Sequence, residues 1–211
     1  MAELVTSGFR VSVRELREES YRALRSRGYD WGQAQAASRL AAEAQVLWGS
    51  GLGAIEHECS RLLGKRRFPV SDSQGTIRNR GSSFTIWGPI AASLAISRAD
   101  STTKVRGVLN SESLATAFWD FDEFSTWSWG DSVNKFAIDQ MGNLISNSGT
   151  SSSKSSISIN KSMGNGSDFK VLLSADERKQ KLKDSLTNGV EVDSKKWSAL
   201  KKHSWKFLVP E

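Results

Sequence analysis

Apolar residues recur at helical spacing through the first part of the chain. The segment Ser12-Val-Arg-Glu15 matches the S-x-x-E capping box and predicts a helix that ends at Gly28. Asp30 begins the same pattern again and predicts a second, alanine-rich helix that ends near Trp48. A shorter third helix is expected over residues 54–63. These segments predict an N-terminal helical lobe of two to three helices.

The pattern changes to short alternating segments in the second part of the chain. Residues 67–83 are rich in turn formers and lack periodicity, which predicts a connection. Pro89 is suited to the first turn of an apolar helix, and Ser111 begins another helix. A charged helix and a helix capped by Asp193 are expected near the C-terminus. The predicted strands are residues 104–109, 133–139, 143–147, 155–160, 168–174 and the closing segment 205–209.

These elements predict an α+β fold. The helical lobe covers residues 1–66, and a mixed α/β body with a mostly antiparallel sheet covers residues 84–211. The pattern leaves open whether the two form one continuous domain. Residues 146–167 are mostly Ser, Asn and Gly, which is typical of a flexible linker, but Ile157 and Ile159 alternate within them, so part of this segment is expected to be a strand.

Composition restricts the class of protein. The chain of 211 residues is 38% hydrophobic and 25% charged, with one cysteine and a net charge of +6. The N-terminus does not resemble a secretory signal, no apolar run is long enough to cross a membrane, and a single Cys59 suits a reducing cytoplasm. The basic runs are short and interspersed with acids, so a nucleic-acid partner is not expected.

One glycine-rich segment, GSGLGA at residues 49–54, satisfies the G-x-G-x-x-G/A pattern of dinucleotide-binding loops. Such a loop requires a preceding strand, but here an alanine-rich helix precedes it. Gly49 is therefore interpreted as the left-handed residue that ends a helix. We expect no cofactor from this motif.

Other chemically suggestive groups have simpler interpretations. His57 and Cys59 would lie on different faces of a helix, and His203 is the only other histidine, so no metal site is predicted. Asp120 and Asp122 resemble a D-x-D signature within an aromatic cluster, residues 118–129, which favours core packing or a protein interface.

Two hypotheses for function follow, and neither decides whether the protein is an enzyme. In the first, a small anionic metabolite binds between the helical lobe and the α+β body, because arginine binds carboxylate and phosphate well. The candidate ligand-binding residues are Ser50, Gly51, Lys65, Arg66, Arg67, Arg78 and Arg80. In the second, a non-catalytic protein uses the aromatic cluster to bind a partner or a second copy of itself in a homo-oligomer. The candidate interface residues are Trp119, Phe124, Trp127 and Trp129.

Residues 12–53 resemble the N-terminal helical region of the malate/L-lactate dehydrogenase-like superfamily. Glu15-Leu16, Gly28 and Glu43-Ala44 match its pattern. In that superfamily an S-H-G histidine serves as acid/base for a nicotinamide-dependent hydride transfer, and here residues 51–53 read Gly-Leu-Gly. The remaining chain is expected to be too short and too different for the cofactor region of that fold.

Most of the chain also resembles a bacterial family catalogued only as a domain of unknown function. The matching segments are Gly28 to Ala34, Ile86 to Ala91, Trp197 to Leu200 and Val209-Pro210. This second resemblance implies a family without implying a reaction.

Overall fold

The computed structural model describes residues 8–61, 69–98, 100–109, 111–121, 126–131, 133–147, 154–161 and 169–208. The chain forms two compact units, which are described separately here. The first comprises residues 1–66 together with 180–211, and the second comprises residues 67–179.

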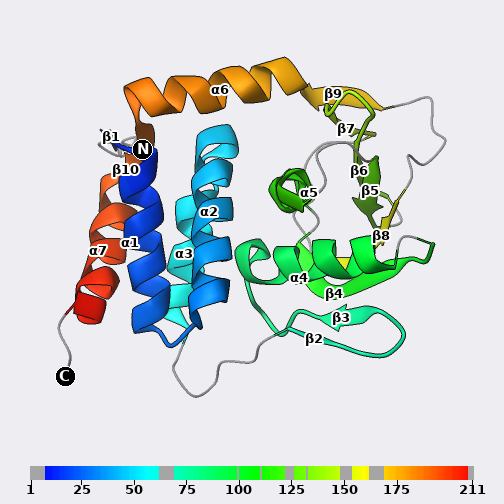
Figure 1. Ribbon diagram of the computed structural model, residues 1–211, viewed down its shortest axis with the longest axis horizontal. Coiled ribbons are helices and arrows are strands. Elements are labelled where there is room, and N and C mark those ends of the chain that lie inside the picture. Colours follow the sequence, from blue (N-terminus) through cyan, green and yellow to red (C-terminus); the bar gives the residue numbers. More distant parts are fainter. Residues whose placement is uncertain are drawn as a thin grey trace, which may run out of the picture. The chain divides into compact units, whose positions relative to one another are not determined.

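Four packed helices form the body of the first unit (Figure 1). Ser12 Oγ accepts the Glu15 N–H at 3.0 Å, as the capping box predicted, and Asp30 Oδ1 accepts the Gln33 N–H at 2.7 Å. The core between the helices is aliphatic, with small alanines that allow close approach. The helices are α1 (Val13–Ser26), α2 (Trp31–Trp48), α3 (Gly51–Ser60) and α7 (Ser194–Leu208).

Two segments far apart in the sequence pair in a two-stranded antiparallel sheet. Strand β1 (Gly8–Val11) pairs with β10 (Val190–Asp193), so that Gly8 lies opposite Asp193 and Val11 opposite Val190. The apolar residues Val190 and Val192 alternate with exposed Glu191 and face the helices. Between the two units, the chain runs through α6 (Ala175–Asn188), and the boundary at residues 179 and 180 falls within this helix.

The second unit is built on one mixed sheet with strand order β2-β3-β4-β8-β5-β6-β7-β9. Neighbouring strands are antiparallel, apart from β3 and β4, which are parallel. Their bounds are β2 (Val70–Ser71), β3 (Thr76–Arg78), β4 (Thr103–Leu109), β5 (Trp127–Gly130), β6 (Lys135–Ile138), β7 (Leu144–Ser146), β8 (Lys154–Asn160) and β9 (Lys170–Leu173).

Stacked aromatic rings form the core of the second unit beside α4 (Phe84–Ser97), the short 3₁₀ helix η1 (Glu112–Leu114) and α5 (Ala115–Phe121). The Phe118 ring lies 5.1 Å from the Trp127 ring and 5.5 Å from the Trp129 ring, centroid to centroid. Phe136 continues the stack, 5.9 Å from Trp129. Phe118, Trp127 and Trp129 of the aromatic cluster are therefore part of the core.

The predicted α+β class with a mostly antiparallel sheet is confirmed. Some boundaries differ. Helix α3 starts at Gly51 instead of residue 54, and α4 starts five residues before Pro89. The expected closing strand at residues 205–209 is wrong, because α7 continues through Leu208. The division of the chain differs too, since residues 180–211 group with the N-terminal helices.

Across the residues that the structure describes, no helix combines the length and apolar character needed to span a bilayer.

Replacing the ring at the centre of the aromatic stack tests its role in stability. Phe118→Ala leaves a cavity between two fully buried tryptophans, so we expect a loss of about 3–5 kcal/mol in the free energy of unfolding, measured by urea denaturation. The control is Trp31→Ala, which removes a 64% exposed ring and should cost less than about 0.5 kcal/mol. Equal losses in the two variants would contradict this assignment.

Candidate functional site

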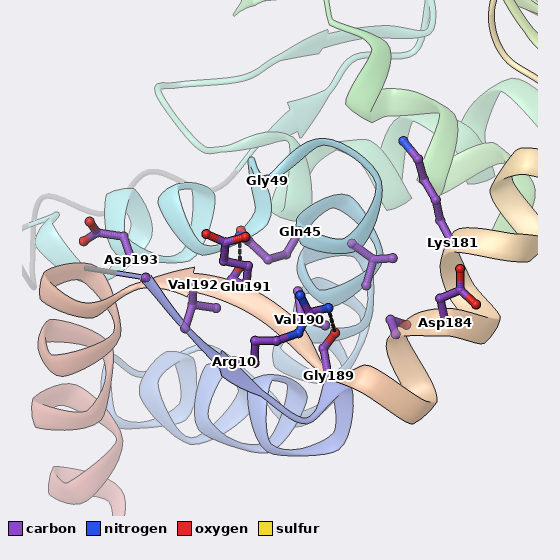
Figure 2. A pocket seen from close by; sticks show the side chains of 13 residues that line it. Arg10, Gln45, Gly49, Lys181, Asp184, Gly189, Val190, Glu191, Val192 and Asp193 are labelled. Carbon is purple, nitrogen blue, oxygen red and sulfur yellow. Dashed lines mark hydrogen bonds between the residues drawn. The ribbon is translucent and has the colours of Figure 1, made fainter. Parts of the chain in front are cut away.

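A cavity of about 540 Å³ lies within the first unit, which is a size typical of small-molecule sites (Figure 2). Its walls come from β1, the C-terminal end of α2, the C-terminal half of α6, and β10. Most of its side chains are polar. The lining residues used below are Arg10, Gln45, Lys181, Asp184, Glu191 and Asp193.

Gln45 joins three elements at the wall of the cavity. Its Nε2 donates to the Glu191 carbonyl of β10 at 3.0 Å, and its Oε1 accepts the Leu52 N–H of α3 at 2.9 Å. The side chain is 9% exposed, so these hydrogen bonds are largely shielded from water. Gln45 therefore fixes the end of α2, the start of α3 and β10 relative to one another.

The charged side chains of the cavity differ in their hydrogen bonds. The Arg10 guanidinium donates to the Asn188 carbonyl at 2.6 Å and to the Gly189 carbonyl at 2.8 Å. The Lys181 ammonium donates to the Leu47 carbonyl at 3.4 Å. Both cations are thus directed to main-chain oxygens at helix ends, and the carboxylates of Asp184, Glu191 and Asp193 complete the wall.

The junction of α2 and α3 lies next to the cavity and contains the glycine-rich segment. Gly49 adopts φ +69° and ends α2, as the sequence predicted, and it also lines the cavity. At Gly51 the two helix backbones approach so closely that a Cβ atom would lie 1.7 Å from the Ala41 carbonyl oxygen. Only glycine fits this position.

The segment that aligns with the S-H-G motif carries no acid–base side chain. Gly51 is excluded from carrying one by its contact with Ala41, and Leu52 is buried. From α7, Lys196 reaches this segment, with its Nζ 3.7 Å from the position that a Gly53 Cβ would occupy. Asp193 Oδ1 accepts the Lys196 N–H at 2.9 Å and so caps the helix that carries this lysine.

The predicted ligand-binding residues are spread over the chain. Ser50 and Gly51 lie at the start of α3 in the first unit, whereas Arg78 and Arg80 are exposed in the second unit, on β3 and in the turn after it. The basic run Lys65, Arg66 and Arg67 lies outside the described residues. Of the predicted residues that the structure describes, none lines the cavity, and Ser50 and Gly51 directly follow Gly49, which does.

The predicted interface residues form no exposed surface where the structure describes them. Trp119, Trp127 and Trp129 are 5%, 1% and 1% exposed, because α5 and β5 turn them into the core. The Arg178 guanidinium also covers the Trp119 ring, 4.3 Å from its centroid. Phe124 lies outside the described residues.

The two histidines lie apart from the cavity. His57 is exposed on α3, and His203 is half-buried on α7. Burial lowers the pKa of His203 from its ordinary 6.5, and the positive charges of Arg27 and Lys206 lower it further. Within the described ranges, His, Cys, Asp and Glu form no group of three or more that could hold a metal ion.

The residues that sequence reasoning missed come from distant parts of the chain. Arg10 and Glu191 reach the same cavity because β1 pairs with β10. Lys181 and Asp184 look like ordinary solvent-facing charges of a helix. Apolar and polar residues alternate over residues 190–193, and this alternation is the local sequence pattern that indicates strand β10.

Comparison with solved structures shows which fold this is. The chain is similar to malate dehydrogenase from Entamoeba histolytica, with a TM-score of 0.65 and 9% identity over 97% of this chain and 99% of the other. Malate dehydrogenase from Pyrococcus horikoshii has a TM-score of 0.63 and 9% identity, over 96% and 97%. Sulfolactate dehydrogenase from Methanocaldococcus jannaschii has a TM-score of 0.59 and 10% identity, over 95% and 98%.

At these identities the likeness shows the fold, and it agrees with the resemblance to the malate/L-lactate dehydrogenase-like superfamily. The likeness extends over nearly all of this chain, so the later part shares the fold as well; the expectation that it is too short and too different for the cofactor region stays a prediction. No protein-family model and no curated protein matches the sequence, so the resemblance to a family of unknown function is not confirmed.

The comparison also corrects both hypotheses for function. The similar structures are dehydrogenases. They therefore support neither a non-catalytic interaction protein nor a metabolite-binding protein with its site between two lobes. The burial of Trp119, Trp127 and Trp129 removes the surface on which the interaction hypothesis depended.

Two glycines of the same segment provide a matched test of the α2–α3 contact. In Gly51→Ala the new methyl group collides with the Ala41 carbonyl, and we expect a loss of about 3 kcal/mol or more in the free energy of unfolding. In Gly53→Ala the nearest atom is the mobile Lys196 Nζ at 3.7 Å, and alanine favours the helix, so a gain of about 0.5–1 kcal/mol is expected. Urea denaturation measures both; a tolerated Gly51→Ala would contradict the close approach.

The lowered pKa of His203 makes stability depend on pH. Because the folded state binds this proton less readily than the unfolded state, the free energy of unfolding should fall as the pH drops below about 6.5. Replacing the histidine by glutamine removes this contribution. Urea denaturation from pH 7.5 to 5 should therefore show a smaller loss for His203→Gln than for the unmodified protein. His57→Gln is the control and should keep the full loss.

Proposed function

We propose that this protein is an oxidoreductase that acts on a small molecule. The observation that carries the proposal is the likeness to dehydrogenases over nearly the whole chain, with TM-scores of 0.59 to 0.65. A shared fold alone permits different chemistries, so the assignment needs support from residues. The cavity of about 540 Å³, next to the junction where the resemblance places the acid–base residue, supplies that support.

Residues 51–53 provide no histidine for proton transfer. Reduction of a carbonyl compound requires a proton donor at the carbonyl oxygen. The ammonium of Lys196 is the charged group that reaches residues 51–53, and the cap at Asp193 orders the turn that carries it. We assign Lys196 as this proton donor.

A nicotinamide dinucleotide, which the superfamily resemblance implies, does not fit the cavity. Its pyrophosphate would face the carboxylates of Asp184, Glu191 and Asp193, while Arg10 is engaged with two main-chain carbonyls. The glycine-rich segment follows a helix and not the strand that a dinucleotide loop needs. We therefore place no cofactor in the first unit.

Three expectations from the sequence belong to this proposal. We propose that the protein works in the cytoplasm, where the buried thiol of Cys59 stays reduced, and that it forms a homo-oligomer. We also propose, from the matching segments of the sequence alone, that it belongs to the bacterial family of unknown function.

The proposal is tested with the substrates named for the neighbouring enzymes. We expect the protein to oxidise malate or sulfolactate. The electron acceptor in the assay is NAD⁺, NADP⁺ or the artificial acceptor dichlorophenolindophenol, and the change in its absorbance measures the rate. In the direction of oxidation Lys196 would accept the hydroxyl proton, the reverse of the donation proposed for reduction, so Lys196→Met should lower the rate by at least about 100-fold. Lys195→Met is the matched control, since it removes an exposed charge from the same turn of α7 and should keep the rate.

Equal rates in Lys196→Met and the unmodified protein would overturn the role of Lys196. Absence of turnover with every substrate and acceptor, in protein shown to be folded by circular dichroism, would count against the oxidoreductase itself.

A further inference from the structure

Helices α1 and α2 lie side by side in the first unit (Figure 1). A groove of about 500 Å³ lies between them, and Leu186 of α6 completes its wall. This groove shares no lining residue with the cavity described above. It is therefore a separate feature of the helical unit, and a volume of this size is typical of small-molecule sites.

The groove is elongated along the two helices. On α1 it is lined by Val13, Arg17 and Tyr21, at intervals of four residues. On α2 it is lined by Trp31 and, seven residues later, by Ser38. Residues at these intervals share one face of a helix. From Val13 to Tyr21 the helix rises by about 12 Å, so the groove suits an extended chain better than a compact molecule.

Large apolar side chains are exposed in this groove. The Trp31 side chain is 64% exposed and that of Leu186 is 78% exposed. Ser38 is buried, and its Oγ donates to the Gln35 carbonyl at 2.9 Å, so an apolar molecule placed against it leaves no hydroxyl donor unsatisfied. Exposed apolar side chains that gather at one place mark a binding site, whereas scattered ones need no explanation.

The charges of the groove favour an anion. Glu18 is the carboxylate among the described lining residues, and two arginines bind it, Arg14 at 2.8 Å and Arg22 at 3.7 Å. Arg17 is exposed, and its guanidinium forms no hydrogen bond or ion pair with any residue that the structure describes. A cation is therefore left without a counter-charge beside an apolar surface. A guanidinium can donate two parallel hydrogen bonds to one carboxylate.

We propose that this groove binds a fatty acid, whose carboxylate accepts hydrogen bonds from Arg17 and whose hydrocarbon chain covers Trp31 and Leu186. The charge of Arg17 and the apolar wall are thereby matched by one amphipathic molecule. The inference goes beyond the proposed oxidoreductase and uses none of its residues, so a binding assay and a turnover assay can fail independently.

Three probes separate the contributions of charge and chain. Decanoate carries both features, decyltrimethylammonium has the same chain with a positive charge, and acetate has the carboxylate without the chain. Isothermal titration calorimetry with the full chain, below micelle-forming concentrations, should show saturable binding of decanoate. Decyltrimethylammonium should bind at least about fivefold more weakly, because its charge is repelled by Arg17. Acetate should bind at least about 100-fold more weakly, because it buries almost no apolar surface.

A failure of decanoate to bind would overturn the proposal. Equal or tighter binding of decyltrimethylammonium would overturn it as well.

A charge variant tests the contact with the carboxylate. Arg17→Gln keeps a long polar side chain and removes the charge, so decanoate should bind about fivefold more weakly. Arg106→Gln is the matched control, since it removes an exposed arginine of β4 in the second unit and should leave binding unchanged. Unchanged affinity in Arg17→Gln, or an equal loss in Arg106→Gln, would show that decanoate responds to net charge alone and would contradict the inference.

An apolar variant tests the contact with the chain. Leu186→Ala removes apolar surface from the wall, so decanoate should bind about fivefold more weakly. Leu109→Ala, which shortens a 49% exposed leucine of β4, is the control and should leave binding unchanged. Unchanged affinity in Leu186→Ala would place the hydrocarbon chain elsewhere and would contradict the inference.

A second copy of this chain is the other occupant that the groove could take. Sedimentation velocity tests this alternative with Trp31→Ala and Leu186→Ala. Both variants should keep the assembly state of the unmodified protein. Conversion of an oligomer to a monomer by either variant would make the groove an interface between copies and would overturn the proposal.

Discussion

The helical unit depends on a contact between two main chains, at Gly51 of α3 and Ala41 of α2. Helix α3 approaches α2 so closely that there is no room for a side chain at position 51. Gln45 then fixes this arrangement by bonding the first turn of α3 and the β10 main chain at once. The cavity borders on the end of α2, which Gln45 holds in place, so its shape is a consequence of packing.

The sequence predicted the features that depend on neighbouring residues. The caps at Ser12, Asp30 and Asp193 each satisfy an amide three residues ahead, so their signals are local. The left-handed end of α2 at Gly49 is local for the same reason. The pairing of β1 with β10 joins residues about 180 positions apart, and no pattern in either segment names its partner. The cavity follows from that pairing, so it could not be predicted.

The errors of sequence reasoning have identifiable physical causes. The segment WKFLV has strand-like residues, but α7 packs along α1 and tertiary contact extends the helix through it. Tryptophan-rich segments look alike whether they are exposed or buried, and here the rings stack on Phe118 and Phe136 inside the second unit. Arg78 and Arg80 suggested an anionic ligand, but they belong to the second unit, whereas the cavity is lined by residues of the first.

The pairing of β1 with β10 also determines when the helical unit can form during synthesis. Residues 8–61 leave the ribosome first, but α1 packs on α7, and Glu19 binds Ser204 near the end of the chain. The second unit, residues 67–179, contains all of its own sheet and emerges complete before these partners exist. The second unit is therefore able to form before α7 has been synthesised, whereas α1 lacks its α7 contact until residues 194–208 follow.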